Sequence, residues 1–385
     1  MFKRYLILLF GISAAISLLV FLVIRQVDPY GTVRSERVAG LNMVKPASYR
    51  HKEAAKRSRF LRSDADLLLL GNSRVDVGFD SHSPRWSVSG FKPFNFGIPG
   101  QDYAGNFNQY YFALASGKAP RRVIVGLDFI DFINPAIRRT PDVGDAHIHP
   151  AVAGSFSLVA LIDSVKTIAA QHSAGADDMT ELGYNTLASY RAIIAGEGHD
   201  SVARQRNRAN LQTYTKLKTI RAAAPAPDFF DMAPLRNFLE RAAREKTDVT
   251  LFFHPYHLDL LASLDKAALT DLFKAWKLAV RKTMNKSGTD ARLYDFATLN
   301  IVTSEPIPGP GDTKSHMQYY WEPGHYKSAL GELMICIMLQ DDCPLNIAAD
   351  PLDTKLDFTG VEPSLRSQSK ERLGPSRPAI DRPAS

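Results

Sequence analysis

The hydrophobic and polar positions divide the chain into three regions, and the first is a continuous apolar run. Tyr5 to Ile24 contains no charged residue. A helix of about 20 apolar residues is about 30 Å long, which is the thickness of the hydrocarbon core of a bilayer. Lys3 and Arg4 precede the run, and basic flanks stay on the cytoplasmic side. We therefore predict that residues 1–25 form a transmembrane anchor, with the N-terminus inside and the rest of the chain outside.

A cleaved signal peptide and a buried core helix are the alternatives to a retained anchor. The apolar core of a signal peptide usually spans about 7–15 residues and is followed by a cleavage site of small residues. The run here is longer, and residues 20–31 (VFLVIRQVDPYG) contain no such site. Arg25 weakens the charge bias without reversing it, because the amino terminus is also positive. A single-pass anchor is the favoured interpretation.

The second region, residues 64–345, alternates short apolar runs with helical patterns. The runs with strand character are Asp66–Gly71, Pro93–Phe96, Arg122–Leu127, Asp248–Phe253 and Arg292–Phe296. The helical patterns are Asn106–Ser116, Pro234–Arg244, Ala267–Met284 and Tyr326–Met338. This alternation predicts a three-layer α/β/α fold with a mostly parallel five-stranded sheet. Functional groups in such folds collect beyond the carboxyl ends of the strands.

Three segments do not follow the alternation. Residues 26–63 are polar and basic, and we expect a stalk that leads into a helix over Pro46–Leu61. Residues 135–227 are rich in Ala and largely helical by pattern, which predicts an insertion between the third and fourth strands. The third region, residues 346–385, becomes rich in Ser, Pro and Arg from Gly360 onward, and this composition predicts a disordered tail.

Composition excludes several classes of function. The net charge of +7 is spread along 385 residues without a basic stripe, so we expect no nucleic-acid partner. Cys336 and Cys343 could pair outside the cytoplasm or remain as two buried thiols. Two cysteines are too few for a metal site. Residues 145–149 (DAHIH) carry metal-ligand chemistry but are far in sequence from other ligands, so a surface loop is the better interpretation. We predict no metal and no cofactor.

The strongest chemical signal follows the first predicted strand, where residues 67–79 read LLLLGNSRVDVGF. Gly71 permits a tight turn. Ser73 then comes just past the carboxyl end of the strand, where backbone N–H groups can hold an oxyanion. Serine is a weak nucleophile and needs a base, which in turn needs an orienting group. Glu322 and His325 precede the last predicted helix, and a short turn brings the carboxylate and the imidazole together.

These segments resemble, in order, the motif blocks of the SGNH (GDSL-like) hydrolase superfamily. The first block has Gly-Asp-Ser or Gly-Asn-Ser after the first strand, and this chain has GNS at residues 71–73. The second block has a glycine in the loop after the second strand, and this chain has NFGIPG at residues 95–100. The last block is Asp-x-x-His before the final helix, and this chain has EPGH at residues 322–325. The resemblance covers roughly residues 64–340.

The resemblance is strongest to membrane-anchored bacterial members linked to O-acylation of cell-surface polysaccharide. It implies Ser73 as nucleophile, His325 as base and Glu322 as the group that orients the base. It implies Gly100, or else Gly97, as an oxyanion donor together with the Ser73 amide. It also implies an inner-membrane protein with a periplasmic domain that acts on surface polysaccharide. Some members act beside a multi-spanning membrane protein that supplies acyl groups.

The chain departs from the superfamily in two places. The third block normally supplies an asparagine after the third strand, but residues 126–129 read GLDF and place Asp128 there. An ionised carboxylate cannot donate a hydrogen bond, and losing one oxyanion donor typically costs about 10²–10³ in rate. The second departure, Glu322 for aspartate, is chemically tolerable. Two hypotheses follow: a serine O-acetyltransferase or acetylesterase, and a catalytically inactive module of the same fold that binds or assembles polysaccharide.

Four further residues are candidates for substrate binding. Arg74, beside the serine, could bind an anionic substrate or pair with Asp128. His254 and His257 follow the fourth strand and could line an acceptor pocket, or they could be solvated loop residues. Trp321 could stack on a sugar ring, although packing in the core is the default for an aromatic residue.

Overall fold

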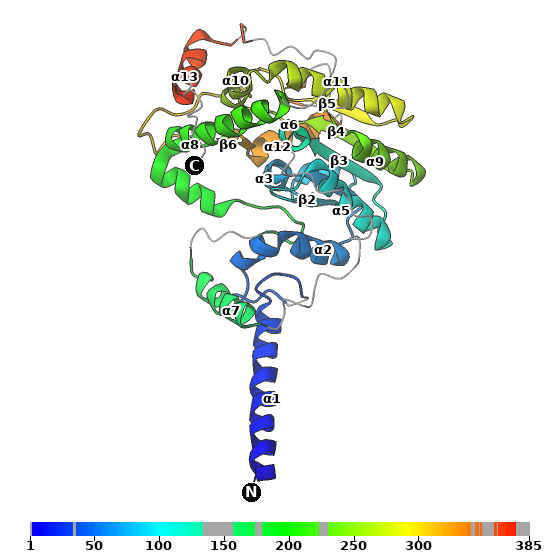
Figure 1. The fold of residues 1–385 in the computed structure, drawn as a ribbon, viewed down its shortest axis with the longest axis vertical. Coiled ribbons are helices and arrows are strands. Elements are labelled where there is room, and N and C mark those ends of the chain that lie inside the picture. Colours follow the sequence, from blue (N-terminus) through cyan, green and yellow to red (C-terminus); the bar gives the residue numbers. More distant parts are fainter. Residues whose placement is uncertain are drawn as a thin grey trace, which may run out of the picture.

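Five apolar runs form one parallel sheet, as the sequence predicts (Figure 1). In the computed structural model the strands are β1 (Leu67–Gly71), β2 (Pro93–Gly97), β3 (Arg122–Leu127), β4 (Asp248–Phe253) and β5 (Arg292–Asp295). Their order is β2-β1-β3-β4-β5, and every neighbouring pair is parallel. The structure describes residues 2–33, 36–133, 157–173, 179–222, 230–339, 343–345, 347–348, 358–359 and 361–374.

Both faces of the sheet are buried, and this confirms the three-layer α/β/α fold. Leu68 and Leu70 of β1 belong to one hydrophobic core, whereas Leu67 and Leu69 belong to the other, because successive side chains of a strand point to opposite faces. The first core contains residues of α2 (Lys52–Arg62), α5 (Tyr103–Ala115), α9 (Ala233–Arg244), α10 (Leu258–Lys266) and α11 (Thr270–Lys286). The second contains residues of α4 (Pro84–Val88) and α12 (Ser328–Leu339).

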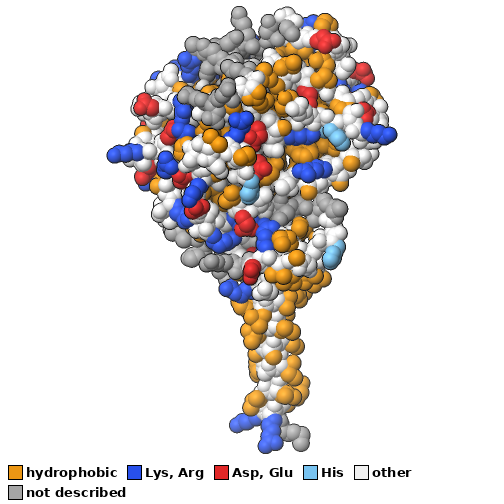
Figure 2. Space-filling model, turned by 180° about the vertical axis from the view of Figure 1, so that it is seen from behind, with side chains coloured by type: hydrophobic (Ala, Val, Ile, Leu, Met, Phe, Trp, Pro, Cys, Tyr) orange, Lys and Arg blue, Asp and Glu red, His pale blue; other side chains and the backbone are white. Residues whose placement is uncertain are grey.

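The N-terminal helix α1 (Phe2–Val27) projects from the rest of the protein as a stem (Figures 1 and 2). It is long and apolar enough to cross a membrane, and most of its side chains are exposed. Hydrophobic side chains cover the stem, and basic side chains gather at its free end (Figure 2). The chain then enters η1 (Pro46–His51), a 3-10 helix, and continues as α2. The helix predicted over Pro46–Leu61 is therefore two consecutive elements.

The predicted insertion lies between β3 and β4 as expected, but it does not form one unit. It contains α7 (Leu158–Ala170) and α8 (Ala188–Ala222), and the short α6 (Phe129–Ile133) precedes it. α7 packs against α1 and η1, away from the sheet, whereas α8 contacts α10 and the strand β6 (Tyr320–Glu322). Residues 134–156, which include the DAHIH segment, lie outside the described residues.

Part of the predicted disordered tail is ordered, which corrects that prediction. Residues Pro363–Leu373 form α13, which packs on α8 and α10. The buried Arg372 donates from Nε to Asp259 Oδ2 at 2.6 Å and from a second nitrogen to Oδ1 at 3.0 Å. This bidentate ion pair and the buried Leu373 anchor a segment that contains few large apolar residues.

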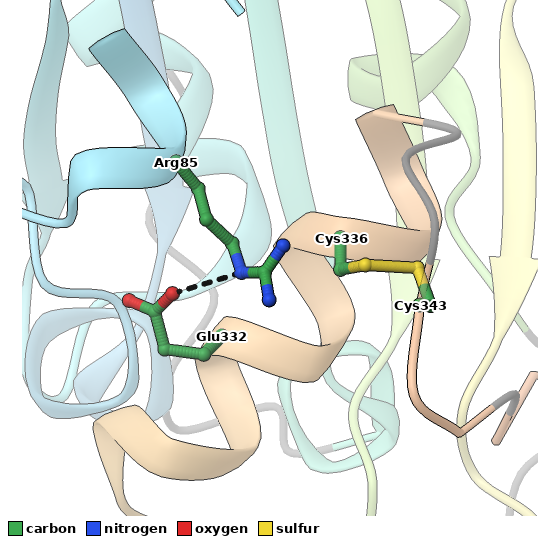
Figure 3. The surroundings of a disulfide bond; sticks show 4 residues. All are labelled: Arg85, Glu332, Cys336 and Cys343. Atoms are coloured by element: carbon green, nitrogen blue, oxygen red, sulfur yellow. Dashed lines mark ion pairs between the residues drawn. A yellow bond between two sulfur atoms is a disulfide. The ribbon is translucent and has the colours of Figure 1, made fainter. Parts of the chain in front are cut away.

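The two cysteines are paired, which decides between the two alternatives that the sequence left open. Cys336 in α12 forms a disulfide with Cys343, and their Cα atoms are 5.7 Å apart (Figure 3). On the same helix, Glu332 Oε2 forms an ion pair with Arg85 Nε of α4 at 3.3 Å (Figure 3). Both contacts hold α12 in place beside the second core.

The short helix α3 (Ser73–Gly78) lies very close to its neighbours. A Cβ atom on Gly97 of β2 would stand 2.3 Å from the backbone nitrogen of Asp76. A Cβ on Gly78 would stand 2.0 Å from the ring of Tyr326, which belongs to β7 (His325–Tyr326). A Cβ on Gly331 of α12 would stand 1.9 Å from the carbonyl oxygen of Gly78. These positions require glycine because backbone or a buried ring occupies the space.

We predict that Gly331→Ala destabilises the protein by about 1–3 kcal/mol, because the new methyl group must push α12 away from α3. The matched control is Gly196→Ala in α8, where a Cβ meets nothing within 4 Å. Alanine is favoured over glycine within a helix, so the control is expected to be neutral or stabilising. Thermal unfolding of the full chain in detergent measures both. Equal melting temperatures for the two variants would contradict the close packing.

Candidate active site

Three predicted residues meet at the carboxyl end of β1. The Ser73 Oγ atom lies 2.8 Å from His325 Nε2. The Nδ1 atom of the same ring is hydrogen-bonded to Glu322 Oε1. Glu322 is 2% exposed, whereas the side chain of His325 is 30% exposed and Ser73 is half-buried. A serine, a histidine and a carboxylate therefore form a continuous hydrogen-bonded chain that is open to solvent at its serine end.

The environment of Glu322 fixes which nitrogen of His325 carries the proton. Burial acts to raise the pKa of Glu322, but attraction to the His325 ring and hydrogen bonds from that ring and from the Gly324 N–H outweigh it and lower the pKa. An ionised carboxylate only accepts, so Nδ1 must donate. Nε2 then holds a lone pair toward the Ser73 hydroxyl, which is the arrangement of a general base.

The loop after β1 places Ser73 at the start of α3. Gly71 allows the tight turn, because a Cβ there would stand 2.3 Å from Val75 Cγ2. Asn72 caps the helix, and its Oδ1 accepts from the Arg74 N–H at 3.0 Å. Ser73 is the first residue of the helix, and the first N–H groups of a helix have no acceptor within it. Its amide therefore remains a potential oxyanion donor.

The histidine and the glutamate come from a small hairpin rather than a simple turn. β6 and β7 are antiparallel, and Glu322 is paired with His325 across them. The Gly324 N–H donates to Glu322 Oε2 at 2.8 Å within the turn. Arg74 Nε donates to the Gly324 carbonyl at 2.7 Å, which links the turn directly to α3. Arg74, the residue next to Ser73, thus holds the turn that precedes His325 against α3.

Asp128, which follows β3, is buried, and both of its carboxylate oxygens are engaged. It forms an ion pair with Arg74. Its Oδ2 accepts from Asn72 Nδ2 at 2.6 Å, and its Oδ1 accepts from the Tyr256 hydroxyl at 2.5 Å. The Arg74 guanidinium also lies 5.0 Å from the centre of the Tyr256 ring. Arg74 therefore serves as the partner of a buried carboxylate, the structural alternative that the sequence left open.

A second buried carboxyl group, Asp131, belongs to the same cluster and was not singled out from the sequence. Its Oδ2 accepts from Asn72 Nδ2 at 3.1 Å. Burial raises the pKa of Asp131 to about 7, although Arg74 and the Asn72 hydrogen bond oppose the rise. The only signal was two aspartates three residues apart at the end of an apolar strand, and this pattern alone does not distinguish a buried acid from a solvated one.

The two candidate oxyanion glycines have different environments. The Gly97 N–H donates to Asn95 Oδ1 at 2.8 Å, so this amide is already used within β2. The structure therefore corrects the prediction for Gly97, whose role is the close approach to α3. Gly100 lies on the exposed turn after β2 with φ of 76°, and the space above it is open. Gly100 keeps the predicted donor role as a prediction.

His257 is buried with both ring nitrogens engaged, which corrects its predicted place in an acceptor pocket. The side chain is buried and caps the N-terminus of α10, where Nδ1 accepts from the Asp259 N–H at 3.1 Å. Nε2 donates to the Glu305 carbonyl at 2.8 Å. Both ring nitrogens are thus occupied, one by the first turn of α10 and the other by a carbonyl of the loop between β5 and β6.

His254 is also buried, which corrects its predicted place at a pocket surface. Its Nδ1 lies 3.1 Å from the Tyr326 hydroxyl, and its ring approaches the Cα atom of Gly126. Burial, together with the positive charge of Arg74, holds the pKa of His254 well below the usual range. His254 is therefore a neutral residue that supports Tyr326, the neighbour of the candidate base.

Trp321 packs in the protein rather than presenting a face to a sugar. It is 8% exposed and shares a small apolar cluster with Val77, Ile194 and Val202. Lys327 Nζ lies 4.9 Å from its ring centre. This corrects the prediction of a substrate contact in favour of core packing. Two of its neighbours, Ile194 and Val202, lie on α8, so the insertion supports the back of the β6–β7 hairpin.

Within the ranges that the structure describes, no group of three or more His, Cys, Asp and Glu side chains could hold a metal ion.

We predict a pH-dependent contribution of Asp131 to stability. Its folded pKa of about 7 exceeds the value of about 3.9 for an exposed aspartate. The folded protein therefore holds a proton that the unfolded chain releases, and stability falls as the pH rises from about 4 to about 7. Asp131→Asn removes this term, so the variant should gain stability relative to the wild type across that window. Unfolding temperatures at pH 4.5, 6 and 7.5 measure the gap, and a gap that does not change with pH would contradict it.

Comparisons with protein-family models, with curated proteins and with solved structures give no match to this chain.

Proposed function

We propose that the chain is a membrane-anchored serine acyl-transfer enzyme, an O-acetyltransferase or acetylesterase that acts on cell-surface polysaccharide. The observation that supports it is the 2.8 Å approach of Ser73 Oγ to His325 Nε2, with Glu322 bound on the other side of the ring. The same three positions carry the resemblance to the SGNH superfamily. Agreement between the motif order and the geometry favours a catalytic arrangement over a chance contact.

The proposed reaction proceeds in two half-reactions. His325 Nε2 accepts the hydroxyl proton of Ser73 while Oγ attacks the carbonyl carbon of an acyl ester. The bond to the leaving alcohol then breaks, this alcohol takes the proton from His325, and Ser73 carries the acyl group. A sugar hydroxyl, or water, gives its proton to His325 and attacks the acyl-serine. This step releases Ser73 and forms either a new ester or a free acid. Glu322 orients the ring throughout.

The proposed location combines α1 with the disulfide. α1 is long and apolar enough to cross a membrane, and the basic residues Lys3 and Arg4 precede its apolar run. The Cys336–Cys343 bond favours an oxidising compartment outside the cytoplasm. Together they support a periplasmic domain on the inner membrane, where surface polysaccharide passes. A multi-spanning membrane protein as acyl donor is suggested by the resemblance to the superfamily.

The rival proposal is an inactive SGNH-like module that binds or assembles polysaccharide. The observation that favours it is Asp128, a carboxylate engaged by Arg74, Asn72 and Tyr256 at the place of an oxyanion donor. An acceptor there cannot stabilise an oxyanion. An active enzyme must then use the Ser73 amide and a second donor such as Gly100.

Covalent labelling with a fluorophosphonate probe distinguishes the two proposals. The purified full chain should be labelled, Ser73→Ala should lose all labelling, and Glu322→Gln should be labelled at least about a hundredfold more slowly because the base is misoriented. The same order is expected for hydrolysis of an aryl acetate and for acetyl content of surface polysaccharide in cells.

The matched control is Ser87→Ala, an exposed serine of α4 that should label as the wild type does. A wild-type chain that is not labelled would establish the inactive module. Labelling that persists in Ser73→Ala would place the reactive serine elsewhere.

The oxidation state of the cysteines tests the proposed location. The full chain is taken from cells, denatured and treated with a thiol-reactive polyethylene glycol maleimide. Without reduction it should not be modified, and after reduction it should gain two additions, one on each cysteine. The control is the same domain without residues 2–27, which stays in the reducing cytoplasm and should react without reduction. Free thiols in the full chain would refute an extracytoplasmic domain.

A further inference from the structure

The helix α7 (Leu158–Ala170) buries polar residues and exposes apolar ones, the opposite of a surface helix in a soluble domain. Three of the four buried residues of α7 are polar, namely Asp163, Ser164 and Thr167, and the fourth is Ala160. Tyr30 donates to Asp163 Oδ2 at 2.8 Å, and Arg50 pairs with Asp163 Oδ1 at 2.6 Å. A surface helix in water normally buries its apolar face and exposes its polar face.

The opposite face of α7 is apolar and exposed. Leu158 is 72% exposed and Val165 is 60% exposed, and Ile162 lies four positions after Leu158 and three positions before Val165. This spacing places the three side chains on one stripe of the helix. The exposed large apolar residues of the helix are Leu158, Val159, Ile162, Val165 and Ile168. A stripe of this kind in water exposes apolar surface with no compensating contact.

The position of α7 beside α1 indicates what covers its exposed apolar stripe. Ala160 and Leu161 pack with Val20 and Ile24, which form the last turn of the apolar run of α1. If α1 crosses a bilayer, this turn lies where the hydrocarbon core ends, because the run spans about 30 Å. Figure 1 shows α7 beside the end of the stem, at the base of the domain. In Figure 2 hydrophobic side chains continue from the stem onto that base.

The exposed charges around this face are positive. Lys166 is the exposed charged residue of α7, and Arg25 is exposed in the last turn of α1. The side chain of Arg50 is 56% exposed while it pairs with Asp163. Cations that flank an apolar stripe match the anionic phosphates of lipid head groups above the acyl chains.

We propose that α7 is a second membrane-contacting element, an interfacial helix that buries its apolar stripe in the bilayer beside α1. Its lipid partner is the boundary between head groups and acyl chains on the side of the soluble domain. The proposal depends on α1 spanning the membrane and is independent of the chemistry proposed for Ser73. α1 and α7 together then hold the domain at a fixed height and tilt, which one helix alone does not do.

Depth-dependent quenching in vesicles tests this proposal. Full-length chains that carry one added cysteine, Ile162→Cys or Val165→Cys, are labelled with an environment-sensitive fluorophore while the native disulfide remains intact. They are reconstituted in vesicles of phosphatidylcholine and phosphatidylglycerol that contain lipids with a nitroxide near the top or near the end of the acyl chain. Shallow nitroxides should quench both labels at least about twofold more than deep ones, as expected for a helix at the interface.

Two control positions make the outcome decisive. Leu278→Cys, at a half-exposed leucine of α11 on the soluble domain, should be quenched by neither lipid. Ile12→Cys, near the middle of α1, should be quenched most by the deep nitroxide. Unchanged melting temperatures show that the variants fold.

If Ile12 is quenched and the α7 labels behave like Leu278, the proposal is refuted while the anchor stands. If no lipid quenches the α7 labels but Val165→Cys forms a disulfide-linked dimer, the stripe contacts a second copy of the chain and the proposal is also refuted. If Ile12 itself is not quenched, α1 does not span the membrane and the proposal falls with it.

Discussion

The candidate site depends on how closely α3 lies against its neighbours. Ser73 begins this helix, and His325 begins the strand that packs on it, so the distance between them is set by the gap between α3 and β7. Gly78 lets the Tyr326 ring fill that gap, and Gly331 lets α12 approach the end of α3 from the other side. A methyl group at either position would collide with backbone or with a buried ring. The hydrogen bond from serine to histidine is thus a consequence of packing that only glycine permits.

A buried ion pair holds the other side of α3. Lys56 of α2 donates to Asp76 Oδ1 and to the Gly97 carbonyl, both at 2.6 Å, and Asn185 donates to Asp76 Oδ2 at 3.0 Å. Removing one partner of such a pair would leave a buried charge without compensation, which costs several kcal/mol. The arrangement also connects distant segments, because η1 and α2 are consecutive and Arg50 of η1 pairs with Asp163 of α7. Polar contacts therefore link the proposed interfacial helix to the helix that carries Ser73.

Much of this architecture could be predicted from the sequence, because strands and their ends are local properties. The runs Arg122–Leu127 and Asp248–Phe253 are strands with the predicted bounds, and Ser73 and Glu322 lie at element ends as expected. The predictions for His254, His257 and Trp321 required knowledge of what surrounds each side chain. His257 illustrates the limit: its place after a strand was correct, but a helix cap and a carbonyl from a distant loop occupy its nitrogens. α13 shows the same limit, since its order depends on long-range contacts such as the ion pairs of Arg372 with Asp259 and of Glu371 with Arg204.

Asp128 has two opposite effects on the candidate site. As a replacement for an asparagine it removes a hydrogen-bond donor, and from sequence alone it argues against catalysis. In the structure it neutralises Arg74, and Arg74 in turn holds the carbonyl of Gly324 beside the candidate base. An asparagine at this position would remove the direct ion-pair partner of Arg74, whose side chain is 11% exposed beside Ser73. The carboxylate that would weaken the proposed oxyanion site thus stabilises the loop that carries His325, and the two effects oppose each other within the same few residues.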